Sequence, residues 1–119
     1  MTPNEYQKLA LRTDSTSAAQ LYQLKSMTKA RLLNGLMGLN GEAGEAIDIF
    51  KKYLFQGHAL NREHLAKELG DVAWYLALSA DALGYTLEEV FRMNIEKLRE
   101  RYPDGFETGR SLHRTREDV

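Results

Sequence analysis

Apolar positions recur every three to four residues along most of the chain, and no stretch alternates between apolar and polar residues as a half-buried strand would. This spacing predicts helices over about residues 3–11, 29–54, 62–83 and 87–102. Residues 13–17 are typical of a loop, and residues 18–28 have no clear register. The pattern therefore predicts an all-α fold, with a single domain over residues 1–106 and a polar C-terminal tail over residues 107–119.

Residues that favour helix ends stand near these boundaries. Two capping boxes, Thr2–Glu5 and Thr86–Glu89, place a hydroxyl side chain before the first turn and a glutamate three residues later. Asn61 can cap the third predicted helix, Gly84 can end it, and Pro103 cannot continue the fourth. The sequence therefore contains residues that favour both the start and the end of each of the last two predicted helices.

Length and composition narrow the class of protein. The chain has 119 residues, the size of one domain, and its net charge of −1 argues against nucleic-acid binding by bulk charge. It contains no cysteine, which excludes disulfides and thiolate metal sites, and no apolar run of the roughly 20 residues that span a bilayer. We expect a cytoplasmic protein with no nucleic-acid or membrane partner. Because so small a chain buries only about two-thirds of its unfolded surface, we expect a bundle of four or five helices that oligomerisation completes.

Two acidic pairs lie on the two central predicted helices. Glu42 and Glu45 are three residues apart in one helix, and Glu68 and Asp71 repeat that spacing in the next. At about 100° per residue, each pair falls at the edge of an apolar stripe that we expect to form the core. The stripes comprise Leu36, Leu39, Ala43, Ala46, Ile47, Phe50 and Leu54, then Leu65, Leu69, Val72, Ala73, Leu76, Ala80 and Leu83. Residues 72–80 are apolar nearly all round, so the second pair leads into a segment that we expect to be buried.

Four carboxylates brought together suit a divalent cation. Like charges at this spacing repel, and packing two acidic pairs together raises carboxylate pKa values unless a cation intervenes. Without histidine or cysteine ligands, such a site favours Mg²⁺, which Mn²⁺ can replace, over Zn²⁺. Gly41 and Gly44 indicate a close approach to the helix backbone beside the acids, either by a ligand or by a packed helix. The alternative is that both acidic pairs lie on exposed, solvated helix faces.

The fourth predicted helix carries the opposite charge. Asn94, Lys97 and Arg101 align on one face beside apolar residues, where a cation is unusual unless an anion meets it. Lysine and arginine in that position can bind phosphate oxygens. Alternatively, they extend to solvent or pair with Glu96 and Glu100.

Three segments together resemble the MazG-like nucleoside triphosphate pyrophosphohydrolases. They are residues 38–45, 68–76 and 94–103, which contain Glu-x-x-Glu, Glu-x-x-Asp and Asn-x-x-Lys in this order. The resemblance covers about residues 30–106. It implies an all-α homodimer or dimer of dimers. It also implies Mg²⁺-dependent hydrolysis of a nucleoside triphosphate between the α and β phosphates, which releases a nucleoside monophosphate and pyrophosphate.

The resemblance also implies roles for individual residues. The catalytic, metal-binding carboxylates would be Glu42, Glu45, Glu68 and Asp71, with Glu45 as the candidate that takes a proton from the attacking water. The residues that bind substrate would be Lys52, Asn94, Lys97, Arg101 and Tyr102. Trp74 would stack on the base, or would instead pack at the subunit interface.

Other functions stay open at this point. The dimeric dUTPases and phosphoribosyl-ATP pyrophosphohydrolase share the acidic helices, although the Tyr-His pair typical of the latter is replaced here by Trp74-Tyr75-Leu76. A di-iron bundle needs Glu-x-x-His, which is absent, and we expect the 3 histidines to be solvated. A non-catalytic helical interaction module is the remaining alternative.

Overall fold

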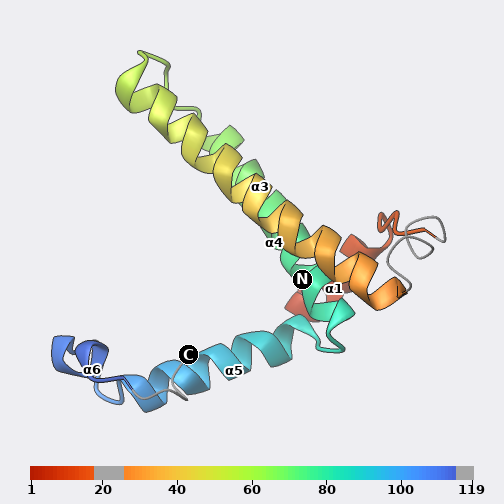
Figure 1. Ribbon diagram of the computed structural model, residues 1–119. Helices are drawn as coiled ribbons and strands as arrows, with labels where there is room; N and C mark the ends of the chain where they lie inside the picture. Colours follow the sequence, from red (N-terminus) through yellow and green to blue (C-terminus); the bar gives the residue numbers. More distant parts are fainter. Residues whose placement is uncertain (18–25, 115–119) are drawn as a thin grey trace.

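The computed structural model describes residues 1–17 and 26–114, and these form helices without a strand. The helices are α1 (Pro3–Leu11), α3 (Met27–Phe55), α4 (Arg62–Ala82), α5 (Leu87–Arg101) and α6 (Thr108–Leu112), shown in Figure 1. The predicted all-α fold is therefore confirmed. Within the described residues, no helix is long and apolar enough to cross a membrane.

The predicted helix ends agree closely with the structure. At the start of α1 the Thr2 hydroxyl accepts from the Glu5 amide at 3.1 Å, and the Glu5 carboxylate accepts from the Thr2 amide at 2.8 Å. Thr86 caps α5 by accepting from the Glu89 amide at 3.2 Å, but the Glu89 carboxylate accepts from the Thr86 hydroxyl at 3.3 Å and not from its amide, so only half of this predicted capping box forms. Gly84 follows α4 with a φ of +84°, a conformation that glycine adopts readily. The short helix α6, within the segment predicted to be a polar tail, was not expected from the pattern.

α3 and α4 form a long antiparallel hairpin (Figure 1). Glycines in the first half of α3 let the two helices approach closely, because a Cβ at Gly35 would overlap the Ser79 side chain and one at Gly38 would overlap the Tyr75 ring. Gly41 and Gly44 have nothing within 4 Å of a Cβ placed on them. The close helix contact therefore lies at Gly35 and Gly38, before the acidic residues, and not at the two glycines that the sequence singled out.

A small core forms where α1, α4 and α5 meet. Its centre is Ala10, Ala77, Ala80 and Leu87, with Tyr6, Trp74, Leu76 and Val90 packed around it. The residues at 77–80 are buried, and Leu78 has no exposed surface. The prediction of a buried segment after Asp71 is thus confirmed for its second half, while residues 72–76 are half-buried.

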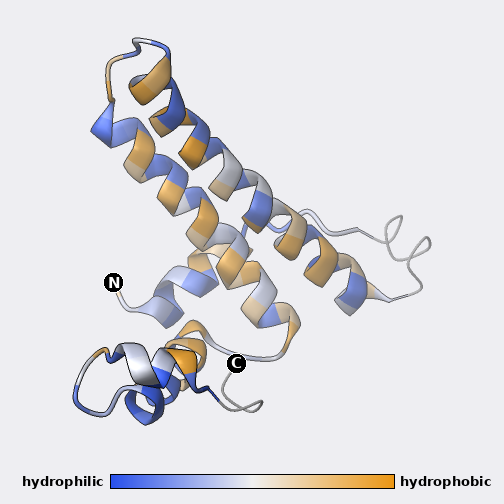
Figure 2. Ribbon diagram, turned by 60° about the vertical axis from the view of Figure 1, so that its left-hand side comes forward, coloured by the Kyte–Doolittle hydropathy of each residue, from blue (hydrophilic) through white to orange (hydrophobic). Residues whose placement is uncertain are grey.

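The predicted core stripe of α3 is wrong for most of its members in the single chain, although Leu39 and Ala46 are half-buried. Leu36, Ile47 and Leu54 are 48%, 65% and 55% exposed, and Leu69 and Leu83 of the α4 stripe are also exposed. The reason is that α3 turns its small residues Gly35 and Gly38 toward α4, and this directs its large apolar side chains outward. Figure 2 shows hydrophobic positions repeated along the hairpin.

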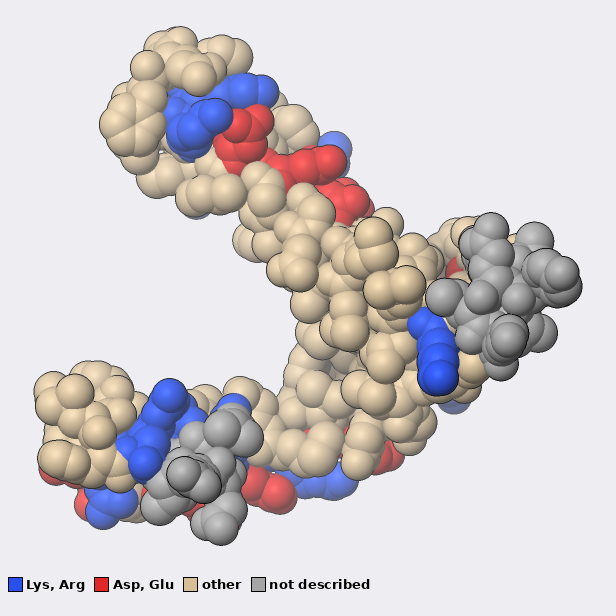
Figure 3. Space-filling view, in the orientation of Figure 1, with Lys and Arg blue, Asp and Glu red and all other residues tan. Residues whose placement is uncertain are grey.

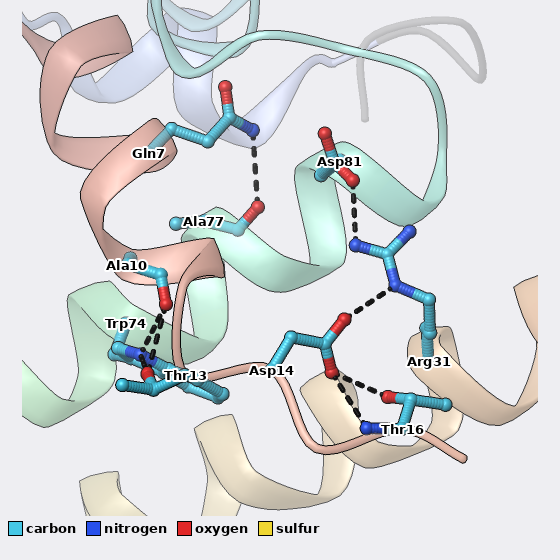
Figure 4. A network of polar contacts seen from close by, with 9 residues as sticks. All are labelled: Gln7, Ala10, Thr13, Asp14, Thr16, Arg31, Trp74, Ala77 and Asp81. Carbon is cyan, nitrogen blue, oxygen red and sulfur yellow. Dashed lines mark hydrogen bonds and ion pairs between the residues drawn. The ribbon is translucent and has the colours of Figure 1, made fainter.

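Two polar groups join α1 and the loop after it to the hairpin (Figure 4). The buried Gln7 side chain donates to the Ala77 carbonyl at 3.1 Å and accepts from the Leu87 amide at 3.3 Å. The Arg31 guanidinium contacts Asp14 at 2.9 Å and Asp81 at 2.6 Å. Burial would raise the pKa of Asp14, but hydrogen bonds from Thr16 and Arg31 outweigh that effect and lower it.

Candidate active site

Three carboxylates from the two hairpin helices converge on one point. Glu42 of α3 and Glu68 and Asp71 of α4 can each offer a carboxylate oxygen such that all lie within 4.8 Å of one another. Glu42 and Glu68 are half-buried and Asp71 is exposed. Figure 3 shows acidic side chains in a row along this hairpin. The i, i+3 pair of α4 and Glu42 of α3 therefore form a compact acidic cluster, which contains three of the four predicted carboxylates.

The cluster is electrostatically unfavourable without a counterion. Burial raises the pKa of Glu42 to about 7, with further contributions from the negative charge of Glu45, a hydrogen bond to Glu68 and the charge of Asp71. Oε2 of Glu42 and Oε2 of Glu68 are both buried without a hydrogen-bond partner among the described residues. A buried oxygen without a partner is costly, and a cation between the two helices would satisfy both atoms.

The fourth predicted carboxylate lies beside the cluster. Glu45 is exposed and lines a hollow of about 400 Å³ whose wall includes Glu68. The other lining residues are Gly41, Gly44, Asp48, Ile49 and His64. Gly41 and Gly44 have no side chain that would fill this hollow, and neither contacts the neighbouring helix there. Their effect is therefore to keep the hollow open and not to bring the helices together.

Two residues in this hollow were missed in the sequence. Asp48 continues the acidic series at i+3 from Glu45, and this spacing was a usable signal. His64 is exposed, as expected of the histidines, yet its Nε2 lies 3.3 Å from Oε1 of Glu68. The signal for that contact was the i, i+4 spacing of the two residues on one helix.

Lys52 contacts Asp48, one of the residues that line this hollow. Its Nζ is 3.0 Å from Asp48, and Lys51 contacts the same carboxylate at 3.0 Å. These hydrogen bonds, that of Lys52 foremost, lower the pKa of Asp48. The predicted substrate-binding lysine is thus anchored one turn beyond the acids, next to Asp48.

Aromatic residues border the other side of the acidic cluster. A hollow of about 310 Å³ is lined by Glu42, Asp71, Trp74 and Tyr75. The Trp74 and Tyr75 rings meet edge to face with centroids 4.9 Å apart. From α1, the Tyr6 hydroxyl donates to the Gly70 carbonyl at 3.4 Å, and burial together with the charge of Asp71 raises the pKa of Tyr6. Trp74 therefore lies beside the acids, as its predicted role in base binding requires.

The predicted phosphate-binding residues of α5 do not join the cluster within one chain. Asn94 is exposed, and Lys97, Arg101 and Tyr102 are half-buried on a helix that diverges from the hairpin (Figures 1 and 3). Arg101 lies over the Tyr102 ring at 5.9 Å from its centroid. Their predicted role in binding phosphates stays a prediction.

Comparison with known proteins places this arrangement in a family. Residues 30–106 match the model of the MazG nucleotide pyrophosphohydrolase domain, a segment that contains the acidic cluster and α5. The Gene 37 protein of Mycobacterium phage L5 is 42% identical over 73 residues, in a match that covers 58% of this chain and 64% of that protein. The chain thus spans slightly less than two-thirds of the length of this relative. No solved structure matches. Because the family model covers well over half of the chain and includes every carboxylate of the cluster, the chain belongs to the MazG nucleotide pyrophosphohydrolase domain family.

Proposed function

We propose that this protein hydrolyses a nucleoside triphosphate, an NTP or a dNTP, at the α–β phosphate bond to give a nucleoside monophosphate and pyrophosphate. The observation that carries the proposal is the pair of buried carboxylate oxygens without partners, on Glu42 and Glu68, beside Asp71. A chain of this family would keep so unfavourable an acidic cluster only if a cation offsets its repulsion.

The donor atoms fit Mg²⁺, with Mn²⁺ as a substitute. Glu42, Glu68 and Asp71 supply carboxylate oxygens only, the ligand type that both ions accept. Glu45, the fourth predicted ligand, lines the adjacent hollow. When bound, the ion would neutralise triphosphate charge and make a water molecule more acidic.

The protein's own groups then have separate tasks in the proposed reaction. Water attacks phosphorus, the bridging α–β P–O bond breaks, and a carboxylate at the edge of the cluster accepts the proton of the water. We assign this role to Glu45, which is exposed to the hollow. Lys52, held by Asp48 at the rim, would attract the phosphate chain.

A second copy of the chain would complete the proposed site. The apolar stripe of α3 is uncovered, and α5 stands away from the carboxylates of its own chain. In a homodimer or dimer of dimers, the stripes would bury one another, and Asn94, Lys97, Arg101 and Tyr102 would approach a nucleotide held by the acids. Burial of large apolar side chains at about 25 cal/mol per Å² gives such an assembly its driving force.

The test is a pyrophosphate-release assay over the common NTPs and dNTPs, with dUTP and phosphoribosyl-ATP included and with Mg²⁺ or Mn²⁺ added. We expect release of pyrophosphate with at least one nucleotide and none in the presence of excess chelator. Turnover of dUTP alone or of phosphoribosyl-ATP alone would assign the chain to one of those related activities. A non-catalytic helical module would release no pyrophosphate, and its melting temperature would rise with neither Mg²⁺ nor a non-hydrolysable dNTP analogue.

A further inference from the structure

Trp74, the single tryptophan of the chain, is held by a segment that lies outside the family match. Its indole Nε1 donates to the Ala10 carbonyl at 3.1 Å and to the Thr13 hydroxyl at 2.8 Å (Figure 4). Both acceptors belong to the end of α1 and the turn after it, whereas the family match begins at residue 30. The orientation of the ring therefore depends on a part of this chain that the family model does not describe.

The same ring forms part of the wall beside the acidic cluster. With Glu42, Asp71 and Tyr75 it lines the open hollow of about 310 Å³, and the Tyr75 ring contacts it edge to face. An indole whose single N–H is shared between two acceptors offers an aromatic ligand a flat apolar surface at low entropic cost. A base attached to a triphosphate has that chemistry, since its phosphates would be drawn to the neighbouring site.

The Thr13 hydroxyl is the side-chain partner that fixes the indole. It donates to the Ala10 carbonyl at 3.0 Å while accepting from Trp74, so both contacts depend on one oxygen atom. Serine can make the same two contacts, whereas valine, which has nearly the shape of threonine, can make neither. In the same loop, the Thr16 hydroxyl bonds to Asp14 at 2.6 Å, which makes Thr16 a matched control.

We propose that Thr13 is a positioning residue for Trp74, and that through it the N-terminal helix sets how tightly the site binds the base of a nucleotide. This proposal rests on the proposed nucleotide hydrolysis and adds a determinant of base affinity to it. Thr13 acts through Trp74 and touches neither the phosphates nor their cation.

The experiment compares T13V, T13S and T16V with the wild-type chain. Isothermal titration calorimetry with Mg²⁺ measures binding of an α,β-methylene dNTP, which has a base, and of tripolyphosphate, which has none. Since a hydrogen bond of this kind contributes about 0.5–1.5 kcal/mol, we expect T13V to weaken binding of the dNTP analogue roughly two- to twelvefold and to leave tripolyphosphate binding unchanged. T13S and T16V should bind both ligands like the wild type. In turnover, KM of T13V should rise while kcat stays close to the wild-type value.

The outcomes separate this proposal from the function on which it rests. Wild-type affinity of T13V for the dNTP analogue overturns the positioning role alone, as does an equal loss of affinity for both ligands. If T13V does not fold, T13A removes the same acceptor hydroxyl, leaves the Trp74 ring in place and is expected to show the same selective loss. A wild-type chain that binds neither ligand overturns the proposed function and this proposal with it. Quenching of the Trp74 emission by the dNTP analogue, but not by tripolyphosphate, is the supporting spectroscopic result.

Discussion

At the scale of single residues, Glu42 shows how the fold holds negatively charged carboxylates close together at the site. Its carboxylate lies between two helices, close to Glu68 and Asp71, with one oxygen buried and without a partner among the described residues. Burial and the neighbouring charges raise its pKa to about 7, well above the ordinary 4.5. Between about pH 4.5 and pH 7, the Glu42 carboxyl is therefore protonated in the folded protein and ionised in the unfolded chain.

This shift predicts a pH dependence of stability in the metal-free protein. Because the folded state binds the proton more tightly than the unfolded chain, the free energy of unfolding should fall as the pH rises from about 4.5 to about 7. Mg²⁺ should offset the loss, so its effect on the melting temperature should be larger at pH 8 than at pH 5.5. Thermal denaturation with and without Mg²⁺ measures both trends. In E42Q the Mg²⁺ effect should be much smaller, and an E42Q protein with the full wild-type response would contradict this account.

The carboxylates could be predicted from the sequence because their spacing is local. Two residues three apart on a helix share a face whatever the rest of the chain does. The neighbours of Trp74 could not be predicted, because its partners Ala10 and Thr13 lie 64 and 61 positions away in the sequence. The i, i+4 spacing of His64 and Glu68 allows their contact. The sequence does not show whether two such exposed side chains meet or are both solvated.

At the scale of elements, α3 combines two kinds of glycine. A Cβ at Gly38 would overlap the Tyr75 ring, whereas Gly41, one turn later, has open space around it. The sequence shows both as glycines inside a helix. Only the position of α4 determines that Gly38 contacts a neighbouring helix and Gly41 does not. The capping residues were predictable for the opposite reason, since Thr2 and Thr86 bond to amides three residues away.

The two glycines form a matched pair for a stability experiment. We expect Gly38→Ala to lower the free energy of unfolding by about 1–3 kcal/mol, because the added methyl forces the Tyr75 ring to move. Gly41→Ala should leave stability unchanged or raise it by up to about 1 kcal/mol, because alanine favours the helix. Chemical denaturation monitored by circular dichroism measures both changes. Equal destabilisation by the two substitutions would contradict the helix packing described here.

At the scale of the whole molecule, one chain leaves much of its apolar surface uncovered. Ile47 and Leu54 are 65% and 55% exposed on α3, and Phe91 and Ile95 are exposed on α5. Periodicity correctly identified the apolar stripe of α3, but it could not say whether another helix of the same chain or another molecule covers it. An amphipathic pattern records that a face is apolar and carries no information about its partner.

This surface predicts the effect of a charge on assembly. Ile47→Lys should convert the proposed oligomer to monomers, because a lysine in place of this exposed residue of the stripe would be buried without a partner in the proposed interface. Leu112→Lys, at an exposed position on α6, should leave the assembly unchanged. Size-exclusion chromatography with light scattering measures the mass of each variant. An Ile47→Lys protein with the wild-type oligomeric mass, or a monomeric wild type, would contradict the proposed assembly.

The most direct test of the central claim is the rate of pyrophosphate release by E68Q, measured with saturating Mg²⁺ on the nucleotide that the wild type turns over fastest. Glu63 provides the matched control, because it lies on the same helix, pairs with Lys67 at 3.3 Å and stands away from the cluster. We expect E68Q to lose at least about a hundredfold in kcat, the lower range for a group that acts in the transition state, while remaining folded. E63Q should retain the wild-type rate. Wild-type-like release by E68Q would show that the acidic cluster is not the catalytic site.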